Sequence, residues 1–123
     1  MNKGLTKGEI EAATRNAIIK FEQEFMGRGP EDVRAFVVRD LVVVRLKGVL
    51  TPAERQLAKT VEGVEMVKRI RQTLIAQGRD QLVEQVSNIT GARVLAIFTD
   101  INAQIGEKVF VFTVDRDLES LGR

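Results

Sequence analysis

Apolar positions recur every three or four residues from Lys7 to Met26, which is typical of a helix buried on one side. The stripe comprises Ile10, Ala13, Ala17, Ile18, Phe21 and Phe25. Thr6 and Glu9 have the spacing of a capping box, and Gly27 is placed to end the helix in a left-handed conformation. The pattern predicts a helix over residues 7–26.

The next two apolar segments, 33–39 and 41–47, are rich in valine and are typical of β-strands. A turn at Arg39-Asp40 pairs Val38 with Leu41, Phe36 with Val43 and Arg34 with Arg45. One face of this predicted hairpin carries Phe36, Val38, Leu41 and Val43. The other carries Val33, Ala35, Val37, Val42, Val44 and Leu46, so both faces are apolar.

The second half of the chain repeats the order of helix and hairpin. Thr51-Pro52-Ala53-Glu54 predicts the start of a short helix that ends near Lys59, and Thr60 offers a second cap. A long helix is predicted over residues 61–88, closed by Gly91, with a stripe of Val67, Ile70, Leu74, Leu82, Val86 and Ile89. Residues 93–99 and 108–114 predict a second hairpin, again apolar on both faces, with Leu95 and Ile97 on the same face.

These elements predict a single α+β domain over residues 1–123, with a core over about 6–114 and a mobile tail over 115–123. Its order is helix, β-hairpin, helices, β-hairpin, with a four-stranded antiparallel sheet packed with helices. An antiparallel sheet usually buries one face and wets the other. Two apolar faces mean either that the three helices cover both, or that a second subunit covers one. We favour a homodimer or a larger homo-oligomer, with two-fold symmetry as the default.

Composition excludes several chemistries. The 123 residues include no Cys and no His, which excludes disulfides, thiolate nucleophiles, Cys- or His-bound metals and Ser-His-Asp catalysis. The net charge is only +2, and the pI of about 9.2 is high because almost nothing titrates between the carboxylates and the lysines. A balanced charge with six Phe and no Trp or Tyr argues against nucleic acid. No cofactor or metal is predicted.

The chain shows neither a signal peptide nor an apolar run long enough to span a bilayer. Its first five residues lack an apolar run, and its longest apolar runs, at 41–44 and 94–98, have four or five residues. We expect a cytoplasmic protein without an integral membrane segment, which leaves peripheral membrane contact open.

Two groups of residues are candidate anion sites. In the loop Gly27-Arg28-Gly29-Pro30, glycine amides beside a guanidinium could contact an anion, or the loop could simply end a helix and turn the chain. Arg34, Arg45 and Lys47 are predicted to cluster at one end of the first hairpin, where like charges require a carboxylate partner or an anionic ligand.

Other candidates have simpler structural explanations. The amides at Thr51 could seat a phosphate, but its own capping box uses them. Asp40 and Asp100 could serve acid–base or magnesium chemistry, but turn aspartates are common for backbone reasons. Lys68, Arg69, Arg71 and Arg79 form either a basic strip or a solvated helix face with ion pairs. No residue is predicted to be catalytic.

Several segments together, in their order and spacing, resemble a known bacterial family. They are residues 27–31, 43–54, 90–91, the strand that ends at Thr99-Asp100, and 109–112. Over about residues 9–114 the chain resembles the MpsC-like family, a component of a Na+-translocating membrane-potential-generating system. Residues 48–61 are the most specific part of this resemblance.

The resemblance implies a small protein that accompanies a membrane-embedded, antiporter-like subunit and a large soluble partner, with no catalytic residues to carry over. The expected function is therefore that of a non-enzymatic accessory or regulatory protein, oligomeric, with a membrane-protein partner. The alternative is a small-anion or nucleotide sensor that uses the Arg28 loop or the Arg34, Arg45 and Lys47 cluster.

Overall fold

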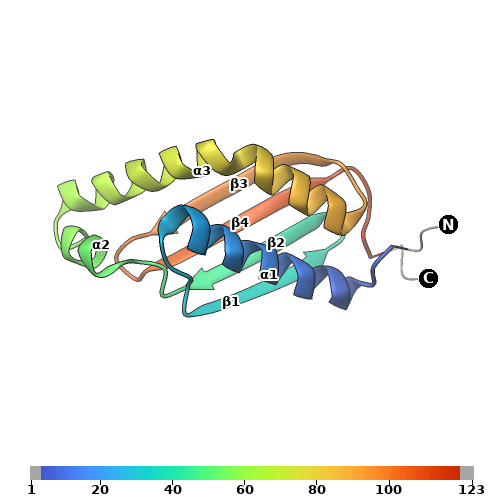
Figure 1. The fold of residues 1–123 in the computed structure, drawn as a ribbon, viewed down its shortest axis with the longest axis horizontal. Helices are drawn as coiled ribbons and strands as arrows, with labels where there is room; N and C mark the ends of the chain where they lie inside the picture. Colours follow the sequence, from blue (N-terminus) through green and yellow to red (C-terminus); the bar gives the residue numbers. More distant parts are fainter. Residues whose placement is uncertain (1–3, 120–123) are drawn as a thin grey trace.

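A computed structural model describes residues 4–119 of the chain. The elements are α1 (Lys7–Met26), β1 (Asp32–Val38), β2 (Leu41–Lys47), α2 (Pro52–Leu57), α3 (Val61–Thr90), β3 (Val94–Asn102) and β4 (Glu107–Val114). The strands form one antiparallel sheet in the order β1-β2-β4-β3 (Figure 1). This arrangement confirms the predicted α+β fold.

Side-chain caps begin all three helices where the sequence predicts them. Thr6 and Thr51 each form a complete capping box, with Glu9 and Glu54 respectively. Thr60 accepts a hydrogen bond from the Gly63 N–H and begins α3. Gly27, with φ 84°, ends α1 in the left-handed region that glycine tolerates best.

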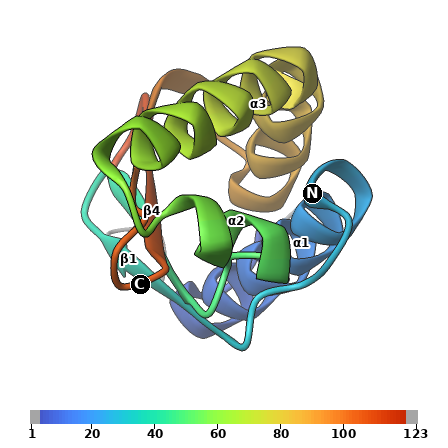
Figure 2. The ribbon, with the colours of Figure 1, turned by 90° about the vertical axis from the view of Figure 1, so that its left-hand side faces the viewer.

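The helices cover only one face of the sheet. Viewed along the strands, α1 and α3 both lie on the same side of the sheet, and the opposite face carries no helix (Figure 2). The covered face is buried, and its residues include Val33, Val37, Val42, Val44, Leu46, Phe110, Phe112 and Val114. Within residues 4–119, therefore, the helices do not cover both apolar faces.

The buried stripe of α3 differs from the predicted one. Ile70 is 47% exposed, whereas Arg71 and Gly78 are buried. Gly78 lies against α1, where an added Cβ would be 2.5 Å from Phe21 Cε1 and 3.0 Å from Phe25 Cζ. The buried stripe includes a charged residue and a glycine, and the spacing of apolar residues alone does not reveal either of them.

The second hairpin has longer strands than predicted and one irregularity. The register shifts between Val94 and Ala96, so Leu95 is an extra residue in β3. Ile97 packs on the core while Leu95 is 52% exposed, so the prediction that they share a face is wrong. A bulge changes the alternation of side chains beyond it, and no feature of the sequence marks it.

Packing continues past the predicted core boundary at residue 114. The Leu118 side chain is buried, and its N–H donates to the Arg39 carbonyl at 2.8 Å. Residues 120–123 of the predicted tail lie outside the described residues.

Side chains of α1 occupy the outer edge of β1. Arg15 Nε donates to the Val33 carbonyl at 3.0 Å, and the Val37 N–H donates to Glu11 Oε2 at 2.9 Å. Two backbone groups that an edge strand would otherwise leave unpaired are thus satisfied.

None of the helices in residues 4–119 combines the length and the apolar character needed to cross a bilayer.

Candidate functional site

The uncovered side of the sheet, called here the outer face, carries two neighbouring apolar rows across all four strands. One row runs Phe36–Val43–Val111–Phe98, and the next runs Val38–Leu41–Thr113–Ala96. Phe36, Val38 and Phe98 are 46%, 49% and 61% exposed. The predicted pairings in the first hairpin are confirmed, so this surface follows directly from the alternation in the sequence.

The other half of the outer face carries two charged rows. These run Arg34–Arg45–Val109–Asp100 and Asp32–Lys47–Glu107–Asn102. The sheet therefore brings the predicted cluster of Arg34, Arg45 and Lys47 together at one end. The same rows contain three carboxylates, so the charges balance.

Carboxylates partner the arginines of this cluster. Arg45 makes a bidentate contact with Glu107, at 2.8 Å from Nε to Oε2 and 3.2 Å from Nη2 to Oε1. Arg34 Nε lies 3.4 Å from Asp32 Oδ2. The hydrogen bond from Arg45 lowers the pKa of Glu107, and the same bond raises the pKa of Arg45. Of the two predicted partners, a carboxylate or an anionic ligand, the sheet supplies the carboxylate.

In the 27–29 loop, Arg28 is engaged within the chain. Arg28 Nη1 donates to the Leu50 carbonyl, which also accepts from Arg55 Nη1 at 3.1 Å. Gly29 lies against Gln23, where an added Cβ would be 3.3 Å from Nε2. The loop thus joins the end of α1 to the segment before α2, in agreement with the structural reading of its sequence. An anion there would compete with the Leu50 carbonyl for Arg28.

A buried ionic cluster of Glu22, Glu54, Arg71 and Lys108 joins the three helices to β4. Lys108 Nζ lies 2.8 Å from Glu22 Oε2, and Arg71 Nη1 lies 3.5 Å from Glu22 Oε1. Arg71 also makes a bidentate contact with Glu54, at 2.7 and 2.9 Å, and donates to the Val49 carbonyl at 2.8 Å. The side chains of Glu22, Arg71 and Lys108 are at most 2% exposed.

The cluster is electrically neutral, with two cations and two carboxylates. Burial lowers the pKa of Lys108, although the neighbouring Glu22 carboxylate opposes that shift. Burial raises the pKa of Glu54, but hydrogen bonds from Arg71 and Thr51 outweigh burial, so the pKa of Glu54 is lowered overall. The adjoining cavity, bordered by Arg71 and Lys108, measures about 20 Å³. That is far below the roughly 300–1,000 Å³ of a small-molecule site, so the cluster is structural.

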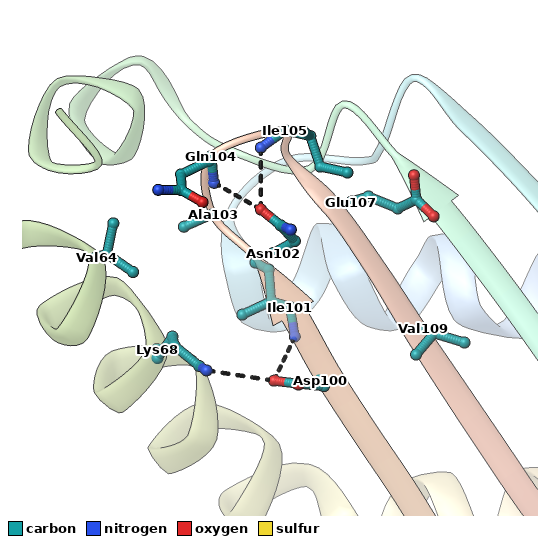
Figure 3. A pocket seen from close by; sticks show the side chains of 10 residues that line it. All are labelled: Val64, Lys68, Asp100, Ile101, Asn102, Ala103, Gln104, Ile105, Glu107 and Val109. Carbon is teal, nitrogen blue, oxygen red and sulfur yellow. Dashed lines mark hydrogen bonds and ion pairs between the residues drawn. The ribbon is translucent and has the colours of Figure 1, made fainter. Parts of the chain in front are cut away.

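A shallow groove of about 480 Å³ lies between α3 and the turn joining β3 to β4 (Figure 3). Lys68 Nζ lies 3.7 Å from Asp100 Oδ1, which also accepts from the Ile101 N–H at 2.8 Å. Asn102 Oδ1 accepts from the N–H groups of Gln104 and Ile105. These polar groups hold the local turn, and the groove brings together no nucleophile with a base.

The structure does not bring the two candidate aspartates together. Asp40 precedes Leu41, which pairs with Thr113, whereas Asp100 pairs with Val109 four residues away. The separation along the strands is at least about 13 Å. Among residues 4–119, no three His, Cys, Asp or Glu side chains are grouped to hold a metal ion. The predicted basic strip is also broken, because Arg71 lies in the core.

Residues 6–116 match the family described as the Na+-translocating membrane potential-generating system, MpsC. The chain belongs to the MpsC family. It is 37% identical over 114 residues to the uncharacterized protein YbcI of Bacillus subtilis, covering 93% of this chain and 92% of that protein. It is 34% identical over 103 residues to the uncharacterized protein YrhF of the same organism, covering 83% and 84%. No solved structure matches the chain.

Two of the segments that resemble the MpsC family, residues 27–31 and 48–54, meet at one end of the molecule. Gly48, with φ 64°, packs against Glu31, where an added Cβ would lie 2.5 Å from the carboxyl carbon. The Arg28 and Leu50 contact joins the same two segments. Glu54 both caps α2 and holds Arg71. In this MpsC protein the most specific stretch of the resemblance therefore packs the helices around the buried cluster.

Sequence reasoning missed this cluster. Arg71 lies four residues after Val67 and seven before Gly78, so its position in the stripe of α3 was the available signal. Lys108 alternates with Phe110 and Phe112 on the covered face of β4, which marks it as buried. Neither signal identifies partners on α1 and α2, because those pairings depend on the tertiary fold.

Proposed function

We propose that this MpsC protein is a non-enzymatic accessory or regulatory protein. It acts as an oligomer in the cytoplasm by binding other protein chains, peripheral to a membrane ion-translocating complex. The observation that carries this proposal is the outer face, whose two apolar rows are open while the opposite face is packed with helices. Exposed apolar patches of this kind mark interaction surfaces.

The side-chain chemistry supports binding over catalysis. The chain has no His or Cys, which are the commonest general base and the most nucleophilic side chain. Two close ion pairs, Arg45 with Glu107 and Arg71 with Glu54, are each joined by two hydrogen bonds. Such groups position elements of the fold and do not activate a substrate.

Family membership supports the association with a membrane system. The family's description names a Na+-translocating system that generates a membrane potential. The part of the chain described here has no helix suited to crossing a bilayer, so it would reach a membrane complex through its surface. The outer face and the exposed side of α3, where Met66 and Ile70 are 45% and 47% exposed, offer apolar surface for such a contact.

The test is affinity capture of the tagged, full-length chain from its native host after gentle membrane solubilisation. Washes at low and high salt separate charge-driven contacts from apolar ones, because exposed ion pairs are screened by salt. We expect an antiporter-like membrane subunit to be retained at both salt concentrations. Met66→Glu on α3 and Val111→Glu on the outer face assign the contact to one of the two surfaces. Recovery of the tagged chain alone would overturn the association with a membrane complex.

A further inference from the structure

The occupant of the outer face follows from the arrangement of its rows. We propose that a second copy of this chain covers it, with the two sheets stacked face to face about a two-fold axis parallel to the strands. This inference rests on the proposed function, because it names the partner that makes the protein an oligomer.

The axis follows from where the apolar rows lie. Both rows are at the end of the sheet that holds the turn between β1 and β2, and the charged rows are at the other end. A two-fold axis parallel to the strands keeps each row opposite itself, so apolar rows meet apolar rows. An in-plane axis perpendicular to the strands places apolar rows against charged ones unless the copies slide apart and lose half their overlap.

The same axis exchanges β1 with β3 and β2 with β4 across the interface, because the sheet order is β1-β2-β4-β3. Phe36 then faces Phe98 of the other copy, and Val43 faces Val111. In the charged rows, Arg34 faces Asp100 and Lys47 faces Glu107. The charges are therefore complementary in the one orientation that also joins the apolar rows, and complementary charge fixes the register of an interface.

The contact area reaches the lower limit for a biological interface between two chains. Paired strands of seven to nine residues, spaced about 4.8 Å apart with a rise of about 3.3 Å per residue, cover roughly 450 Å². Two copies bury twice that, and side-chain relief brings the total to about 1,000 Å² or more, at the lower end of specific interfaces. The balanced charge of the outer face also favours a second copy over an anionic lipid surface, which attracts basic patches.

Dimerisation through the free edge of β1 is less favourable than stacking of the outer faces. Arg15 and Glu11 already bond the Val33 carbonyl and the Val37 N–H on the free edge of β1. A partner strand would have to displace both side chains before it could add to β1. Stacking of the outer faces leaves both of these hydrogen bonds in place.

Sedimentation of the full chain over about a hundredfold concentration range tests the proposal. We expect a monomer–dimer equilibrium for the unmodified chain, and a monomer for Val43→Glu, which places two carboxylates at the centre of the interface. Arg69→Glu makes a charge change on the exposed side of α3 and should leave association unchanged. Far-UV circular dichroism verifies that each variant is folded.

A charge exchange tests the axis itself. Arg34→Glu alone faces Asp100, and Asp100→Lys alone faces Arg34, so each should weaken the dimer about tenfold. An equimolar mixture of the two chains should recover association to within about threefold of the unmodified protein, because each heterodimer then holds one native and one reversed ion pair. In the perpendicular orientation the mixture would show no recovery.

A chain that stays monomeric at every concentration, or a dimer indifferent to Val43→Glu, overturns the proposal. If the unmodified chain dimerises but the mixture of Arg34→Glu and Asp100→Lys chains recovers no association, the proposed axis is wrong. Capture of a membrane subunit by a monomeric chain would leave the proposed association with a membrane complex standing without this dimer. A dimer that captures no membrane protein would support this inference and overturn the association with a membrane complex. The failure of one proposal can therefore be told from the failure of the other.

Discussion

Lys108 Nζ on β4 and Glu22 Oε2 on α1 lie 2.8 Å apart, and both side chains are only 1% exposed. Two charges buried this completely contribute little net stability as a pair, but removing one leaves the other uncompensated. Because Arg71 also contacts Glu22 and bonds Glu54, the four charges fix how α1, α2 and α3 sit on the sheet.

Glu22→Leu should therefore destabilise the fold by about 3–5 kcal/mol, because Lys108 keeps its charge in an apolar setting. Lys108→Met should cost a similar amount by leaving Glu22 with one partner. The double variant Glu22→Leu with Lys108→Met should recover most of that loss, since Arg71 and Glu54 remain a neutral pair. Chemical denaturation of all four proteins completes the cycle. Additive losses in the double variant would show that the two side chains are not coupled.

Glu54 should make the protein acid-sensitive. The pKa of Glu54 is lowered from its ordinary value of 4.5, so the folded state binds fewer protons than the unfolded state. The stability this provides is fully present above pH 4.5 and is lost as the pH falls through the lowered pKa. The difference in unfolding free energy between the unmodified chain and Glu54→Gln should shrink as the pH is lowered from 7 toward 3. A difference independent of pH would contradict this assignment.

Gly78→Ala should destabilise the protein, although alanine is the better helix former. The new methyl would lie 2.5 Å from Phe21 Cε1 and force α1 and α3 apart, which costs about 1–3 kcal/mol. Gly8→Ala on α1 is the matched control, because nothing lies within 4 Å of its added Cβ. That change should be neutral or stabilise by up to about 1 kcal/mol. Thermal melts of the two variants should shift in opposite directions or differ clearly in size.

Arg28→Ala should lower stability without changing the response to anions. The side chain donates to the Leu50 carbonyl, and losing such a bond costs about 1 kcal/mol, more where the carbonyl is buried. Thermal shifts in phosphate and a nucleotide panel should be small for both proteins. A ligand at a hundred times its dissociation constant would add about 2.7 kcal/mol. A shift of that size, lost in Arg28→Ala, would establish the anion-sensor alternative.

Local patterns predict this fold well because its elements have strong local signals. The capping boxes at Thr6 and Thr51 place two helix starts, and the turn at Arg39-Asp40 sets the register of β1 with β2. Leu95 was misplaced because a bulge depends on how two strands meet, which no local window contains.

The sequence predicted the apolar faces of the sheet, but it did not predict which face stays open or that Arg71 is buried. The alternation of side chains along the strands identified both apolar faces. Only the fold shows that α1 and α3 pack on the same face of the sheet. Both readings of the sequence, a basic strip or a solvated helix face, place Arg71 at the surface, because a charge is expected in water unless partners surround it. Its partners, Glu22 and Glu54, lie 49 and 17 positions earlier in the chain.

The bonds that Arg15 and Glu11 make to β1 also bear on how far assembly can proceed. Addition of strands at a bare edge has no natural end, because each new strand exposes another edge, and fibrils grow in this way. With the edge of β1 occupied by α1, growth from that side would require the helix to release the strand. Association through a flat face is self-limiting, since each copy has one such face and uses it once. The chain can therefore expose the apolar outer face for pairing with a second copy while α1 blocks the addition of strands to β1.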